Sequence, residues 1–298
     1  MTIQPVPRQR RHTLYFLREI RAFSPVHLDT EVDMTQVMAH RGAAALDARR
    51  YSVVTYVLHA AARVLERHPQ ANSAIRGTVW PKVIQHSSVN GKLTLDKTIG
   101  GQRVVVAPVL RDLQKASLDD IQRLVDRFRD GDPERMPELA GVRALHRKRW
   151  PFAPRAFRKV ARPLPKRAAV FGTFAVTSLG HRPVDGFHSV GGTTVTLGLG
   201  RVLDRAVVRG GAVAVAPVMR LSLTFDHRVI DGAEAADLLG ELKDDLERLA
   251  LVPASNGHAG AAACADPATA TATAGAPGNE RGHAAAGAPR TGRREDRA

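Results

Sequence analysis

The sequence predicts an α/β fold with a mixed sheet in a single domain. The run from Met219 to Phe225 alternates apolar and polar residues, as a strand with one buried face does. After Gly232 the apolar residues fall at helical spacing, and they do so again after Ser52. Segments of these two kinds alternate along about 250 residues without a clear linker, which is typical of an α/β domain.

The first half of the chain contains strands and two helices. The expected elements are, in order, a strand at 26–33, a helix that opens at Ser52 and stops before Pro69, and strands at 83–85, 92–95 and 103–109. Asn90-Gly91 lies between the second and third of these strands, where this dipeptide is a strong hairpin signal. A helix then begins after Ser117, which forms a capping-box-like pair with Asp120.

Strands dominate the second half. We expect them at 171–178, 193–199, 207–208, 213–218 and up to Phe225, with a turn at Gly210-Gly211. The final helix begins near Gly232. The last strand therefore brings the residues after Phe225 to an edge of the sheet, where strand gives way to helix. Loops in such positions tend to hold reactive groups.

Composition narrows the class of protein. Residues 253–298 consist largely of Ala, Gly, Thr and Pro, so this tail is expected to be disordered. The single cysteine, Cys264, lies in the tail, which excludes an intramolecular disulfide and a CxxC metal site and argues against a cysteine nucleophile. No segment has the roughly 20 apolar residues of a membrane span, and the basic N-terminal extension at 1–11 lacks the apolar core of a signal peptide. A cytoplasmic location is the expectation.

The net charge of +15 is concentrated in one basic insert, residues 143–167, which holds ten Lys or Arg residues and no acid. Such an insert can meet an anionic membrane surface, a phosphorylated cofactor or an acidic partner protein. The alternative is a solvent-exposed surface segment with no binding role. Nucleic acid is not expected as a partner, because the chain contains no zinc-finger or RRM signature.

Residues 226–232, DHRVIDG, place an imidazole and a carboxylate four positions apart. His227 is therefore a candidate general base, and Asp231 is a candidate partner that orients the imidazole or the loop. Asp226 and Arg228 are expected to brace the loop through a charge pair. The alternative for His227 is an ordinary histidine at a strand end. The alternative for Asp231 is a helix N-cap, which is compatible with the catalytic role.

Residues 221–233, LSLTFDHRVIDGA, closely resemble the C-terminal signature of the acyltransferase component of 2-oxo acid dehydrogenase complexes, a family related in fold to chloramphenicol acetyltransferase. GTFAVTSLG at 172–180 and VVAPVLRD at 105–112 are also similar to segments of that family, and Glu31-Val32-Asp33 matches its first strand. The resemblance covers residues 12–252 in the family's order. The basic insert has no counterpart in ordinary members.

The resemblance implies that residues 12–252 form a chloramphenicol acetyltransferase-like catalytic domain, a mixed sheet flanked by helices, which assembles into a homotrimer. It implies that His227 of one subunit and Thr177 of the next face a channel entered by coenzyme A and by an acyl carrier arm. Thr177 is then the candidate donor to the oxyanion, with a plain strand threonine as the alternative. Whether trimers associate into larger shells stays open.

The expected cofactors follow from the resemblance. Coenzyme A is expected as a substrate. No lipoyl domain precedes residue 12, so a lipoyl group is expected in trans, from a lipoyl-bearing or other acyl-carrier protein. No metal is expected, because His181 and His188, which flank residues 182–187, have no neighbours at a recognised ligand spacing.

Two functions remain open from the sequence. The first is an acyltransferase that moves an acyl group between coenzyme A and a thiol acceptor such as dihydrolipoamide on a separate protein. The alternative is a catalytically inactive trimeric scaffold or regulatory protein whose basic insert binds a partner or a membrane. The loop at 186–192, which departs from the family's pattern, favours that alternative. The identity of the acyl group is not determined by the sequence.

Overall fold

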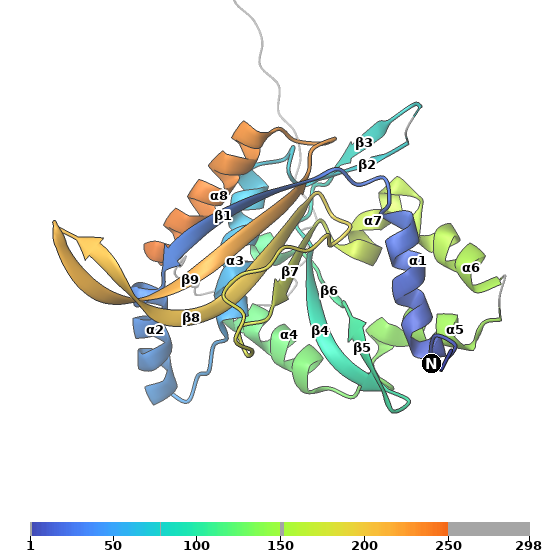
Figure 1. Cartoon of the computed structure of the whole chain (residues 1–298), viewed down its shortest axis with the longest axis horizontal. Coiled ribbons are helices and arrows are strands. Elements are labelled where there is room, and N and C mark those ends of the chain that lie inside the picture. The colour runs from blue at the N-terminus through green and yellow to red at the C-terminus, as the bar shows by residue number, and fades with distance from the viewer. Residues whose placement is uncertain (1, 78, 150–151, 250–298) are drawn as a thin grey trace, which may run out of the picture. The chain divides into compact units, whose positions relative to one another are not determined.

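The computed structural model describes residues 2–77, 79–149 and 152–249. The predicted disordered tail at 253–298, with Cys264, lies outside these residues. The described chain forms a mixed sheet with helices packed against it, which confirms the predicted α/β class (Figure 1). Over these same ranges, no helix combines the length and hydropathy that a membrane span requires.

The main sheet has seven strands. Six follow the order β1-β9-β8-β7-β4-β5, and β6 pairs with β4 beside this path. β7 runs parallel to β4 and β8, whereas the other neighbours are antiparallel. A separate two-stranded sheet pairs β2 with β3. The strands are β1 (Pro25–Asp33), β2 (Ser73–Arg76), β3 (Lys82–Gln85), β4 (Gly91–Ile99), β5 (Gln102–Val106), β6 (Val109–Leu110), β7 (Phe174–Ser178), β8 (Val195–Arg209) and β9 (Ala212–Asp226).

One face of the sheet carries the hydrophobic core. Leu221, Leu223 and Phe225 of β9 are fully buried and share one core with the apolar stripes of α3 and α8. The expectation that only one face of this strand is buried is wrong, because Ser222 and Thr224 on the other face are also buried. Ser52 caps α3, and Ser117 and Asp120 form the predicted capping box of α4. The helices are α1 (Arg11–Glu19), α2 (Thr35–Leu46), α3 (Val53–Arg67), α4 (Leu118–Asp130), α5 (Ala140–Arg147), α6 (Phe152–Ala161), α7 (Leu164–Phe171) and α8 (Gly232–Glu247), with 3₁₀ turns η1 (Arg8–Arg10), η2 (Leu113–Lys115) and η3 (Pro137–Leu139).

The opposite face of the sheet is polar, and two rows of register partners cross it. One row runs through His27, Thr224, Thr196, Ala175 and Lys92. The next row runs through Asp29, Ser222, Gly198, Thr177 and Thr94. Since side chains in register point to the same face of a sheet, this face presents hydroxyl and charged groups on β1, β9, β7 and β4. The candidate residue Thr177 thus lies on a polar surface.

The predicted hairpin at Asn90-Gly91 is wrong. β3 pairs with β2, whereas Gly91 begins β4, an interior strand of the main sheet. A Cβ at Gly91 would lie 2.7 Å from the side chain of Leu113 and 3.0 Å from that of Leu58. The glycine is therefore needed for close packing against the helical layer and not for a turn.

Several other boundaries differ from the expectation. Pro108 separates the strand predicted at 103–109 into β5 and β6, and Phe171 ends α7 instead of opening a strand. The fragments predicted between 193 and Phe225 form two 15-residue strands, β8 and β9, joined at the predicted Gly210-Gly211 turn. β9 lies between β1 and β8, so the strand that leads to His227 is an interior strand and does not form an edge of the sheet.

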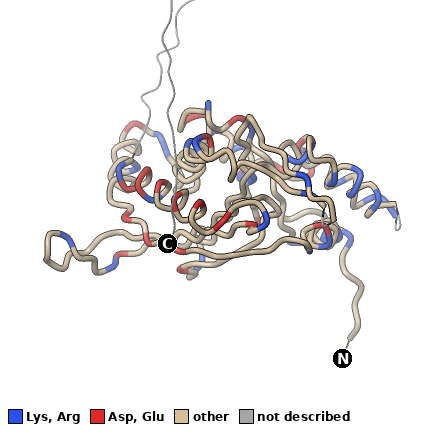
Figure 2. Tube along the Cα trace, turned by 90° about the horizontal axis from the view of Figure 1, so that it is seen from above, with Lys and Arg blue, Asp and Glu red and all other residues tan. Residues whose placement is uncertain are grey.

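The basic insert forms helices that pack on the N-terminal helix α1. Ala153 and Ala161 of α6 are buried, and the rings of Phe157 and Tyr15 are 6.2 Å apart. Glu19 of α1 forms ion pairs of 2.9 Å with Arg158 and Arg162. Lys and Arg positions recur along the trace of this region (Figure 2). The insert is thus part of the folded body as well as a basic surface.

Candidate active site

The loop after β9 is held by the backbone on both sides of His227. The backbone N–H of His227 donates to the carbonyl of Ser24, which precedes β1, at 2.9 Å. The N–H of Val229 donates to the carbonyl of Asp226 at 2.9 Å, which closes a turn between β9 and α8. His227 is therefore placed by a strand, a turn and a neighbouring segment, and its position depends little on its own side chain.

Asp226 and Arg228 brace this turn, as the sequence predicts. The guanidinium of Arg228 donates to both carboxylate oxygens of Asp226, at 2.8 Å and 2.5 Å. Asp226 is 3% exposed, and the backbone N–H groups of Arg228 and Ser24 also donate to its Oδ1 at 3.2 Å and 3.4 Å. A bidentate pair of this kind fixes both distance and orientation.

His227 and Asp231 lie close to each other at the loop surface. Nδ1 of the imidazole is 3.5 Å from Oδ1 of Asp231, and the two side chains are 45% and 90% exposed. Asp231 occupies the N-cap position of α8 but makes no side-chain capping bond. The geometry therefore favours the role of partner to His227 over the capping role. With Nδ1 turned towards a carboxylate, Nε2 is the nitrogen left to accept a proton.

Thr177 and His227 do not meet within one chain. Thr177 is in register with Gly198 of β8, which is in register with Ser222 of β9, five residues before His227. At about 3.3 Å per residue and 4.8 Å per strand, the two Cα atoms are roughly 15–20 Å apart. Thr177 instead lines a hollow of about 930 Å³ with Thr94 of β4, while His227 does not border it.

The polar face also holds a cluster that the sequence did not reveal. Asp29 accepts a hydrogen bond from the Ser222 hydroxyl at 2.5 Å and lies 3.1 Å from Nε2 of His188. The rings of His27 and His188 are 4.7 Å apart, and His27 Nδ1 lies 3.0 Å from the Thr224 hydroxyl. In the sequence, the only indication of this cluster was the polar residues that alternate with apolar ones in β9. Such residues are expected to face solvent, and their burial follows only from the position of the 183–190 loop. Within the described ranges, no group of His, Cys, Asp and Glu has the arrangement of a metal site.

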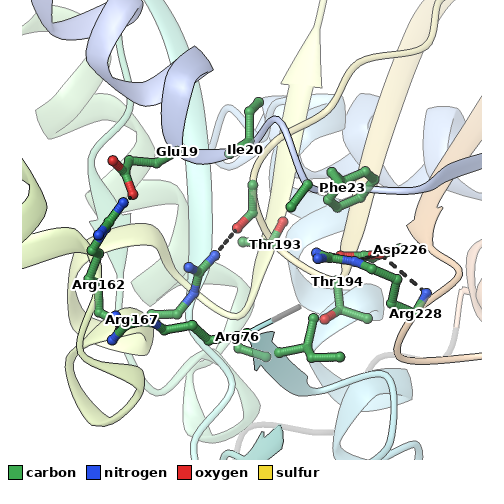
Figure 3. Close-up of a pocket in the computed structure, with 15 residues that line it drawn as sticks. Glu19, Ile20, Phe23, Arg76, Arg162, Arg167, Thr193, Thr194, Asp226 and Arg228 are labelled. Carbon is green, nitrogen blue, oxygen red and sulfur yellow. Dashed lines mark hydrogen bonds and ion pairs between the residues drawn. The ribbon is translucent and has the colours of Figure 1, made fainter. Parts of the chain in front are cut away.

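A second hollow, of about 360 Å³, is bordered by the residues on either side of His227 (Figure 3). Asp226 and Arg228 line it from the loop, and Arg162 and Arg167 line it from the end of the basic insert. The sequence indicated these arginines only as members of a charge run.

The chain matches the family model for the 2-oxoacid dehydrogenases acyltransferase (catalytic domain) over residues 2–135 and 167–253. The unmatched residues 136–166 contain most of the basic insert. The matched segments include both β7 and the His227 loop.

Two curated relatives are similar over most of this chain. The dihydrolipoyllysine-residue acetyltransferase component of the pyruvate dehydrogenase complex of Bacillus subtilis is 27% identical over 226 residues, which are 73% of this chain and 43% of the relative. The succinyltransferase component of the 2-oxoglutarate dehydrogenase complex of Bartonella vinsonii is 26% identical, over 73% of this chain and 46% of the relative. The chain thus spans less than half the length of these relatives.

Solved structures show the same fold. A dihydrolipoamide acetyltransferase of Azotobacter vinelandii has a TM-score of 0.64 at 22% identity, covering 84% of this chain and 92% of that one. A probable dihydrolipoamide acetyltransferase of Listeria monocytogenes has a TM-score of 0.62 at 19% identity, covering 86% and 97%. These similarities confirm the fold that the sequence resemblance implies. With its sheet order, its DHRVIDG loop and a family match over two segments, the chain belongs to the 2-oxoacid dehydrogenases acyltransferase (catalytic domain) family.

Proposed function

We propose that this protein transfers an acyl group between coenzyme A and a thiol acceptor such as dihydrolipoamide on a separate protein. The observation that carries the proposal is the half-exposed imidazole of His227, held at the end of β9 with Nδ1 turned towards Asp231. Family membership supports it, as do relatives named as dihydrolipoyllysine-residue acetyl- and succinyltransferases. The solved Azotobacter vinelandii enzyme was studied for the roles of a serine, a histidine and an asparagine in its mechanism.

The chemistry follows from these residue types. Nε2 of His227 accepts the proton of the attacking thiol, and the resulting sulfur nucleophile adds to the thioester carbonyl carbon. The carbonyl oxygen becomes an oxyanion, to which the Thr177 hydroxyl donates a hydrogen bond. Collapse of this intermediate breaks the original carbon–sulfur bond, and the departing thiolate takes the proton from the imidazolium. The acyl group has then moved from one thiol to the other with no net change in protons.

The separation of Thr177 and His227 within one chain supports a site built between subunits of a homotrimer. The hollow that Thr177 lines supports the same arrangement, because His227 of the same chain does not border it. A channel between subunits offers two entrances, one for coenzyme A and one for a lipoyl arm supplied in trans.

The test is acyl transfer from a panel of acyl-coenzyme A thioesters to free dihydrolipoamide, with the mass of the assembly recorded. His227→Ala is expected to lower the rate on the order of 10² to 10⁴-fold while the mass is unchanged. His12→Ala is the matched control, because His12 lies on α1 and contacts His146 and the Val105 carbonyl. Absence of transfer by a well-formed wild-type assembly with every donor would overturn the proposal and favour the scaffold alternative.

A further inference from the structure

The smaller hollow beside the His227 loop is lined by an excess of arginine. Four guanidinium groups border it, from Arg76, Arg162, Arg167 and Arg228, against the carboxylates of Glu19 and Asp226 (Figure 3). The residues come from α1, β2, the loop between α6 and α7, α7 itself and the loop after β9. Segments that are distant in the sequence thus bring cations to one place.

Both carboxylates already have partners. Glu19 pairs with Arg158 and Arg162, each at 2.9 Å, and Asp226 holds Arg228 in the bidentate pair. Arg76 donates to the carbonyl of Arg162 at 2.9 Å, and Arg167 donates to the carbonyl of Gly192 at 2.8 Å. Among residues 2–77, 79–149 and 152–249, neither Arg76 nor Arg167 forms an ion pair with a carboxylate. These two positive charges at the hollow are therefore not neutralised by a direct ion pair, although Asp226 and Glu19 lie near Arg167.

Arg167 is the more deeply buried of these two. Burial lowers the pKa of its guanidinium and the nearby charges of Arg228 and Arg76 lower it further, whereas Asp226 and Glu19 act in the opposite direction. Its guanidinium also lies over the ring of Phe171, 5.3 Å from the centroid. A half-buried cation without a direct ion pair is costly, and a bound anion reduces that cost.

We propose that this hollow binds a phosphate group, with Arg167 and Arg76 as its principal ligands. Guanidinium forks match the oxygens of a phosphate, and two forks from different elements leave room for bidentate contacts. A volume of about 360 Å³ exceeds what one phosphate fills, so an organic moiety attached to the phosphate also fits. The basic insert supplies Arg162 and Arg167 to this site. Its function then includes ligand binding close to the acyl-transfer loop.

The phosphate can come from two sources, free phosphate or the nucleotide part of coenzyme A. Calorimetric titration of the full chain with inorganic phosphate tests the site itself, without acyl transfer, so this result does not depend on the proposed function. Arg167→Gln and Arg76→Gln are each expected to weaken binding at least about tenfold, because each removes charged hydrogen bonds. Arg155→Gln is the matched control, since Arg155 is exposed on α6 and does not line the hollow. It is expected to change binding less than about twofold.

Displacement of bound phosphate by coenzyme A or 3′-dephospho-coenzyme A distinguishes the two sources of the phosphate group. If coenzyme A displaces phosphate and 3′-dephospho-coenzyme A does so less well, the site holds a phosphate of the nucleotide. If neither displaces it, the site holds free phosphate. The proposal is overturned if the wild type binds no phosphate or if binding survives both Arg→Gln changes. It is also overturned if the dicarboxylate succinate displaces phosphate to the same extent as sulfate, a tetrahedral anion like phosphate. Arg76 is exposed, so its variant remains informative if Arg167→Gln fails to fold.

Discussion

Thr177 and His227 stand two strands apart in the same sheet, with Thr177 in the register row that crosses β9 five residues before His227. Within one chain the hydroxyl of Thr177 is therefore too far away to donate to the carbonyl that a thiol deprotonated by His227 attacks, because about 15–20 Å separates the two Cα positions. The proposed site therefore requires the Thr177 of a second chain. This relationship distinguishes an intersubunit site from one contained in a single subunit.

Mixed assemblies test that requirement. We expect His227→Ala and Thr177→Val, each poorly active alone, to regain about a quarter of wild-type activity when co-expressed in equal amounts, because about one interface in four then joins an intact histidine to an intact threonine. Activity of differently tagged, co-purified assemblies measures this. A mixture of the His227→Ala variant with the double variant is the control, and it should stay inactive. No recovery in verified mixed assemblies would show that the site lies within one chain.

Substitutions of Thr177 test its proposed role as hydrogen-bond donor to the oxyanion. Thr177→Val keeps the shape of the side chain and removes the donor, so kcat is expected to fall about 10² to 10³-fold with little change in KM. Thr177→Ser retains a hydroxyl and is expected to stay within about tenfold of the wild type. Steady-state kinetics with the best acyl donor measures both variants. Equal losses in the valine and serine variants would indicate a packing role for Thr177 and no role as donor.

The two acids of the DHRVIDG loop are expected to differ sharply. The side chain of Asp231 is 90% exposed and 3.5 Å from the imidazole, so Asp231→Asn should lower kcat/KM less than about fivefold. Asp226 is 3% exposed and holds Arg228, so Asp226→Asn should lower the free energy of unfolding by about 3 kcal/mol and reduce activity as the loop loosens. Denaturation and kinetics on both variants measure the contrast. Similar behaviour of the two variants would refute this assignment of roles.

Local patterns predicted the elements that carry the chemistry. The strand β9, the helical stripe of α8 and the capping box at Ser117 and Asp120 depend on residues close in the chain, and the structure confirms them. The single buried face predicted for β9 is wrong, because burial of Ser222 and Thr224 depends on distant segments. Asn90-Gly91 misled the prediction because its glycine serves contacts with Leu58 and Leu113, which are distant in sequence. A dipeptide preference holds no information about such neighbours.

The candidate site was predictable only in part, for the same reason. His227 and Asp231 are four positions apart, and their proximity follows from local geometry. The hollow lined by Arg76 and Arg167 arises from the packing of β2 and α7 around the His227 loop, and nothing in the charge run indicates which arginines turn inwards. Thr177 came from the family resemblance, since a strand threonine has no distinguishing pattern of its own.

The buried amine of Lys92 is expected to make the free energy of unfolding depend on pH. It is 5% exposed on β4, donates to the Gly191 carbonyl and lies 4.9 Å from the centroid of the Phe16 ring. Burial lowers the pKa of its amine to about 7, and the charge of Arg167 contributes to this shift. Below pH 7 the folded and unfolded proteins both carry the charge, and the folded protein bears the full cost of burying it.

Above pH 7 the folded protein releases this proton while the unfolded chain keeps it up to about pH 10.5, so the free energy of unfolding should rise with pH across that interval by on the order of 1.4 kcal/mol per unit. Lys92→Met should therefore be more stable than the wild type at pH 6 by a few kcal/mol, with a difference that shrinks towards pH 10. Urea denaturation at a series of pH values measures this, and Lys82→Met on the exposed strand β3 is the control that should show no such trend. A Lys92→Met advantage that is constant with pH would mean that the amine stays charged in the folded protein, stabilised by the Gly191 carbonyl and the aromatic rings around it.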